Sequence, residues 1–121
     1  MQNNDIPIYS LSDFEGMRKA GSLAASILDK LKEKIEPGVS TLKINDFCHD
    51  LIISNNAIPA PLNYKGFPKS ICTSVNHVVC HGIPSNDKIL NDGDIINVDI
   101  TVILDGWYGD SSRMYVAGKI N

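Results

Sequence analysis

The stretch GDIINVDITVILDGWYGDSS, residues 93–112, decides the fold because it places the dipeptide Asp105-Gly106 between two runs of strand-forming residues. Both central positions of a type I′ turn need a positive φ, which Asp and Gly tolerate. The dipeptide therefore predicts a two-residue β-hairpin turn in which Leu104 faces Trp107. The pairing of the two strands then follows by counting outward from the turn.

This register determines where two aspartates lie. Thr101 falls opposite Asp110, and Ser112 falls opposite Asp99. Directly paired residues share a sheet face, as do residues two apart on one strand. The two carboxylates and the threonine are therefore expected to point the same way, with the aspartates on a diagonal of roughly 7–8 Å.

A converging pair of carboxylates needs a counter-charge, because the two groups repel each other away from water. Oxygen ligands suit Mn, Mg, Ca or Fe(II), and two metals ~3.5–4 Å apart are a known arrangement for hydrolysis. Two aspartates at hairpin positions are also common without any metal. The spacing alone leaves both interpretations open.

The opposite face of the first strand is apolar, which predicts a surface covered by helices. Its residues are Ile96, Val98, Ile100, Val102 and Leu104. On the second strand Gly109, Ser111 and Arg113 fall on this same face. A β-bulge there would reverse the direction in which the later residues point, Asp110 included.

Two helices are predicted before the hairpin. Ser12 and Glu15 have the spacing of a capping box, which predicts a helix start at Ser12, and Pro37-Gly38 ends that helix. A second helix opens at Ser40 or Thr41 and ends at Asn55-Asn56. The apolar residues expected on the first helix are Phe14, Met17, Ala20, Ala24, Ile27, Leu28, Leu31 and Ile35, and those on the second are Leu42, Phe47, Leu51 and Ile52.

The remaining chain reads as an irregular segment at 57–69 and strands at 71–80 and 95–104. Helices followed by mostly antiparallel strands predict an α+β fold, with two helices packed on the sheet. Residues 1–11 are expected to be an N-terminal extension of this single domain. A chain of 121 residues supports one such core.

Composition excludes several classes of partner. The net charge of −3 gives no strong field for nucleic acid or an anionic membrane, and no apolar run approaches ~20 residues. The three cysteines lack CxxC spacing, so we expect reduced thiols in the cytoplasm.

The segment HVVCH places His77 and His81 four residues apart, the spacing of a helical metal site. Its valines favour a strand, in which four residues span about 13 Å, so the two histidines are not expected to chelate one ion. At a strand end, His81 either projects into a cleft or caps a turn on the surface.

Taken together, SVNHVVCHGIP (74–84) and NDGDIINVDITVILDGWYGDSSRMYVAGK (91–119) resemble type I methionine aminopeptidases, members of the pita-bread metallopeptidase family. The resemblance runs from Ser12 to the last residue. The aspartate spacing alone also occurs in proline-specific aminopeptidases, prolidases and creatinase, whereas the His81 segment points to methionine aminopeptidase. The implied function is metal-dependent removal of the initiator methionine from nascent proteins.

The resemblance also implies roles for individual residues. Asp99 and Asp110 would be the first two carboxylate ligands of a centre holding two divalent ions, such as Co, Mn, Fe or Zn. Thr101 would lie beside these metals. His81 would be catalytic, forming a hydrogen bond with the substrate near the scissile amide.

By the same resemblance, Tyr64, Phe67 and Cys72 match positions that line the pocket for the methionine side chain, where aromatic groups and sulfur suit a thioether. Two positions depart from the family. Pro61 stands where related bacterial enzymes often have cysteine, and His77 where many have an acidic residue.

The family has about twice this length and takes a further His and two Glu from its second half. After Asp110 this sequence has no His and no Glu. The resemblance thus covers an N-terminal half, residues 12–121, which is expected to be inactive by itself.

The partners that the resemblance implies are peptides or nascent proteins with N-terminal Met and, by analogy, the ribosome. The alternative function is a non-catalytic binding or assembly module that self-associates through its exposed half-sheet.

Overall fold

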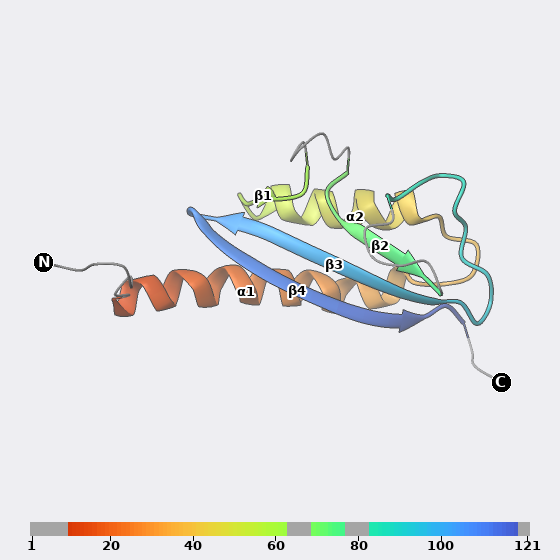
Figure 1. The fold of residues 1–121 in the computed structure, drawn as a ribbon, viewed down its shortest axis with the longest axis horizontal. Helices are drawn as coiled ribbons and strands as arrows, with labels where there is room; N and C mark the ends of the chain where they lie inside the picture. Colours follow the sequence, from red (N-terminus) through yellow and green to blue (C-terminus); the bar gives the residue numbers. More distant parts are fainter. Residues whose placement is uncertain (1–9, 63–68, 77–82, 119–121) are drawn as a thin grey trace, which may run out of the picture.

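The structure, a computed structural model, describes residues 10–62, 69–76 and 83–118 (Figure 1). Helices α1 (Leu11–Leu31) and α2 (Thr41–Ser54) are separated by a short 3-10 helix, η1 (Lys32–Lys34). The strands are β1 (Ile58–Pro59), β2 (Cys72–Val75), β3 (Ile95–Leu104) and β4 (Trp107–Val116). The predicted α+β class, two helices on an antiparallel sheet, is confirmed.

Strand β3 is the centre of the sheet. It pairs with β4 along its whole length, and its other edge is shared by β2, opposite residues 96–99, and by β1, opposite residues 102–103. All three pairings are antiparallel. The sheet is therefore at most three strands wide, with β4 at one edge.

The tight turn between β3 and β4 is the one predicted. Asp105 has φ 52° and Gly106 has φ 85°, the two positive values that a type I′ turn requires. Leu104 pairs with Trp107, and the predicted pairs further along the hairpin are also present. The register expected from the dipeptide is confirmed.

Strand β4 contains no bulge, because its pairing with β3 runs without interruption to Val116. Its small and polar residues face the helices for a different reason. A Cβ on Gly109 would lie 2.1 Å from the carbonyl carbon of Ala20, so the α1 backbone lies directly on this strand. Farther along, Arg113 forms an ion pair with Asp29.

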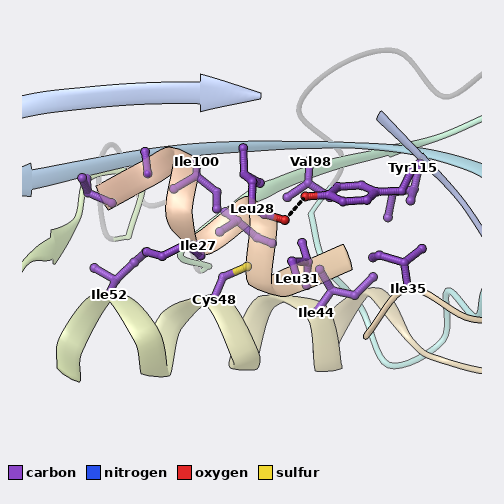
Figure 2. Close-up of a cluster of buried hydrophobic side chains, with 14 of the residues drawn as sticks. Ile27, Leu28, Leu31, Ile35, Ile44, Cys48, Ile52, Val98, Ile100 and Tyr115 are labelled. Atoms are coloured by element: carbon purple, nitrogen blue, oxygen red, sulfur yellow. Dashed lines mark hydrogen bonds between the residues drawn. The ribbon is translucent and has the colours of Figure 1, made fainter. Parts of the chain in front are cut away.

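Both helices contribute to one core on this side of the sheet. In Figure 2, Ile44, Cys48 and Ile52 of α2 point toward residues of α1 and β3. The hydroxyl of Tyr115, on β4, donates a hydrogen bond of 2.7 Å to the carbonyl oxygen of Leu28. Burial and this bond fix α1 against the sheet. The four β3 residues buried in this core are Ile96, Val98, Ile100 and Val102.

The predicted start of the first helix was wrong by one residue, and its cap was assigned to the wrong pair. Ser10 is the N-cap, and its side chain accepts from the backbone N–H of Asp13 while the Asp13 carboxylate accepts from the backbone N–H of Ser10. Aspartate at the third helical position closes the capping box as glutamate would. The start at Leu11 therefore places the last residue of the expected 1–11 extension inside α1.

The buried faces of the helices also differ in part from the prediction. Phe14 is 56% exposed, whereas the apolar stripe from Ala20 onward is buried. On α2 the buried set is Thr41, Ile44, Asn45, Cys48 and Ile52, and the predicted side with Leu42, Phe47 and Leu51 is only partly buried. Polar residues take inner positions because hydrogen bonds satisfy them: the hydroxyl of Thr41 donates to the carbonyl of Ser85 and accepts from its N–H.

Strand β2 is shorter than the predicted 71–80. It ends at Val75, since Asn76 has φ 53°, and residues 77–80 lie outside the described part of the chain. No helix among the described residues is long and apolar enough to cross a bilayer.

Candidate metal centre

The sheet face turned away from the helices carries the two aspartates. Asp99 lies on β3 and alternates with the buried Val98 and Ile100, while Asp110 lies on β4 opposite Thr101. Because Thr101 is two residues from Asp99 on one strand, all three share this open face. Asp99 is half-buried in the middle of the sheet and Asp110 is exposed. The hairpin therefore brings together the two predicted metal ligands and the threonine beside them.

Each carboxylate is held by one neighbouring side chain. The hydroxyl of Thr101 donates to Asp110 Oδ1 at 3.0 Å, and the amide of Asn97 donates to Asp99 Oδ2 at 3.2 Å. These bonds restrict how the carboxylates rotate and leave one oxygen of each for another ligand. Asn97 was missed in the sequence, although it stands two residues before Asp99 and so had to share its face.

No basic side chain within the described ranges forms an ion pair with Asp99 or Asp110. Two uncompensated carboxylates on one face are hard oxygen donors, a donor set that fits a divalent cation. Among the residues whose placement is described, no group of three or more His, Cys, Asp and Glu could hold a metal. The hairpin thus fits two positions of a metal site and needs further ligands to complete one.

Cys72 borders the pair, since it lies on β2 directly opposite Asp99. Partial burial, and then the negative charge of Asp99, raise the pKa of the Cys72 thiol. The Cys72 thiol is therefore a weaker acid than an ordinary cysteine. The other described thiol, Cys48, belongs to the core, and burial raises its pKa to about 12.

Several predicted site residues cannot be placed. His81, Tyr64 and Phe67 lie outside the described residues, and so does His77 of the rejected two-histidine chelate. Their roles stay predictions. Pro61, named above as a departure from the family pattern, is described and is partly buried shortly after β1.

Apolar side chains flank the carboxylates on the open face. Ile58 of β1 pairs with Ile103, which in turn pairs with Tyr108, so the three form a row across the sheet. Ile58 is 60% exposed, Tyr108 is 64% exposed and Met114, toward the other end of β4, is 67% exposed. A polar centre framed by exposed apolar groups is typical of a surface that another structural unit covers.

Comparison with known families and proteins agrees with this arrangement. Residues 15–121 match the model of metallopeptidase family M24. Methionine aminopeptidase of Rickettsia prowazekii is 64% identical over 115 residues, which are 95% of this chain and 44% of that protein. Methionine aminopeptidase of Escherichia coli K12 is 50% identical over 115 residues, 94% of this chain and 44% of the relative. The chain spans less than half the length of these curated relatives.

Solved structures match the fold over the same extent. The crystal structure of methionine aminopeptidase from Rickettsia prowazekii has a TM-score of 0.91 and covers 96% of this chain and 46% of its own. That from Thermotoga maritima, at 32% identity, has a TM-score of 0.90 and covers 96% and 47%. The prolidase from Pyrococcus horikoshii, at 21% identity and a TM-score of 0.74, shares the fold alone.

Proposed function

Because this chain belongs to metallopeptidase family M24 and forms half of a pita-bread fold, we propose that it is the N-terminal half of a methionine aminopeptidase. The proposed reaction is hydrolytic removal of methionine from the N-terminus of peptides and nascent proteins. The observation that carries the proposal is the shared open face of Asp99, Thr101 and Asp110. The identity to methionine aminopeptidases, 64% and 50% in the two relatives above, supports this substrate over others within the family.

In this proposal Asp99 and Asp110 bind divalent metal, two ions in the complete site, drawn from Co, Mn, Fe and Zn. Such ions lower the pKa of water and polarise the scissile carbonyl. Asp99 contributes from the rigid centre of the sheet, and Asp110 from its exposed edge strand. Thr101 keeps the Asp110 carboxylate oriented through its 3.0 Å hydrogen bond.

The other residues act on the substrate. His81 would donate a hydrogen bond near the scissile amide, where it stabilises charge that develops in the transition state. Cys72, with Tyr64 and Phe67, would contact the methionine side chain. The position of Cys72 opposite Asp99 supports this assignment, because it puts the thiol next to the carboxylate pair.

Completion of the site needs donors beyond this hairpin. Two carboxylates replace too little of an ion's water shell to bind it tightly, so we propose that the 121-residue chain alone is inactive. The proposed location is the cytoplasm, and ribosome association is proposed by analogy with the family.

The test joins this chain to the part of the Rickettsia prowazekii relative that follows its matching region. The chimera should bind metal and release methionine from a Met-Ala-Ser peptide. Asp110→Asn should lower both the metal content and the turnover by at least on the order of 100-fold. Asp105→Asn makes the same charge change in the same hairpin, and it should leave both near the parent value. Full turnover in the Asp110 variant would reject the assignment of this residue to the metal site.

One observation favours a second candidate, a non-catalytic module that self-associates. The row of exposed Ile58, half-buried Ile103 and exposed Tyr108 gives the open face an apolar surface that a second copy could cover. Sedimentation velocity over a range of concentrations tests this candidate. It predicts a dimer that Tyr108→Glu abolishes, whereas the half-enzyme proposal is supported by a chain that stays monomeric.

A further inference from the structure

Two residues of α2 form hydrogen bonds with the segment that leads into β2. Asn45 is buried, and its Oδ1 accepts from the backbone N–H of Ser70 at 2.9 Å and of Ile71 at 3.2 Å. One helical turn later, His49 Nδ1 lies 2.7 Å from Ser70 Oγ. Since residues four apart share a helix face, α2 presents one polar patch to this segment.

The contact between His49 and Ser70 has the distance of a nucleophile and its base, yet it does not form a nucleophilic site. Ser70 is only 1% exposed and Ile71 is fully buried. A substrate carbonyl would have no access to the Ser70 oxygen. The hydroxyl can both donate and accept, so the contact with the imidazole is compatible with either of its protonation states. The role of these bonds is therefore to fix the chain.

The segment that they fix borders the candidate metal centre. Cys72 follows Ile71 directly and pairs with Asp99. Earlier in the chain, the N–H of Ala60 donates to the carbonyl of Thr101 at 2.9 Å. Residue 60 and residues 70–72 are thus both attached next to the carboxylates, and the second of these segments is tied to α2 by side-chain hydrogen bonds.

The buried amide is suited to this task. Ser70 and Ile71 present two backbone N–H groups before the regular pairing of β2 begins, and each would lose its hydration on burial. A single carbonyl oxygen with two lone pairs satisfies both donors. Leaving such donors unpaired is costly, so the segment has a strong preference for this one position.

On these contacts we propose that Asn45 and His49 are positioning residues that hold Cys72 in the wall of the substrate pocket beside Asp99. The proposal extends the function given above, because it takes Cys72 as a residue that contacts the substrate side chain. Asn45 contributes most to holding this segment, through its two hydrogen bonds to buried backbone N–H groups. His49 adds a third hydrogen bond, to the Ser70 hydroxyl.

The test measures the thiol of Cys72 in the 121-residue chain, with no need for metal or activity. Alkylation by iodoacetamide, located by tandem mass spectrometry, should be on the order of tenfold faster in Asn45→Leu, which keeps the branched shape of the side chain and removes the acceptor. Hydrogen exchange at Ser70 and Ile71 should rise with it. Asn45→Asp retains an acceptor oxygen and should restore the parent rates.

Cys48 is the internal control, since only unfolding of the core exposes it. If Cys48 becomes reactive in parallel with Cys72, or if Asn45→Asp behaves like Asn45→Leu, the residue is merely structural and the proposal is overturned. Unchanged alkylation of Cys72 in Asn45→Leu overturns it as well. Should the leucine variant not fold, Ser70→Ala removes only the His49 contact, and it should still raise Cys72 reactivity by a smaller factor. An inactive chimera would refute the proposed function while leaving these thiol rates untouched.

Discussion

At the scale of single residues, the absence of a side chain at Gly109 allows α1 to pack closely against β4. Its backbone lies so close to α1 that any Cβ would overlap the Ala20 carbonyl group. We predict that Gly109→Ala lowers the free energy of unfolding by at least about 2 kcal/mol, because backbone cannot move aside as a side chain can. Urea denaturation of the two proteins measures the difference.

The control for this prediction is the neighbouring helical glycine. An added Cβ on Gly21 meets nothing within 4 Å, so Gly21→Ala should be neutral or stabilise the protein by up to about 1 kcal/mol. Equal destabilisation by both substitutions would show that the close approach of α1 to β4 is not what selects glycine at position 109.

Among the single residues of the site, some contacts could be predicted from the sequence and others could not. The pairing of Thr101 with Asp110 follows from a turn of two residues, so it could be counted from Asp105-Gly106. The bonds from Asn45 to Ser70 and Ile71 join positions that are 25 and 26 residues apart in the sequence. The spacing of residues along a helix or strand does not predict a contact of this kind. A pattern-based prediction places an asparagine on the surface, because its burial depends on hydrogen-bond partners that the pattern does not show.

At the scale of elements, regular pairing was predictable and helix faces were less so. The β3–β4 register depends on local turn geometry, whereas the buried side of α2 depends on where α1 and the loops lie. Thr41 and Asn45 occupy inner positions because distant backbone groups bind them. A glycine within a strand marks either a β-bulge or the close approach of another backbone. The sequence alone does not show that α1 lies against Gly109, so a bulge was the alternative that it suggested.

The Asp94 carboxylate is one of the groups that tie the end of β2 to the start of β3. Asp94 accepts from the Asn76 side chain at 3.0 Å and from the backbone N–H of Asn91 at 2.8 Å. The hydrogen bond from Asn76, with that from Asn91, lowers the pKa of Asp94. Its contribution to stability is therefore present above the unfolded pKa and is lost as the pH falls through the lowered folded value.

We predict that Asp94→Asn lowers the melting temperature at neutral pH, because an amide cannot accept both bonds without turning a donor toward one of them. The difference from the parent should shrink as the pH falls below about 4. Thermal unfolding followed by circular dichroism over this range tests it. Asp50→Asn makes the same charge change on an exposed part of α2 and should follow the parent at every pH. A difference for Asp94→Asn that does not vary with pH would contradict the role given to its carboxylate.

At the scale of the whole molecule, the helices cover one face of the sheet and leave the other face open. The helix side buries the strand residues in a continuous core, while the open side combines a carboxylate pair with exposed Ile58, Tyr108 and Met114. Exposed apolar groups lower the solubility of a chain in water. This face is therefore suited to being covered by another structural unit. The chemistry proposed for the chain depends on that uncovered side.

The most direct measurement is a Mn²⁺ titration of the 121-residue chain, followed by paramagnetic broadening of its ¹H–¹⁵N spectrum. Mn²⁺ should bind weakly, with broadening centred on residues 97–101 and 110–112, and the Asp99→Asn, Asp110→Asn double variant should abolish this broadening. Broadening centred elsewhere, such as at the exposed Asp46 and Asp50 of α2, or unchanged in the double variant, would contradict the claim that the hairpin forms half of a metal site.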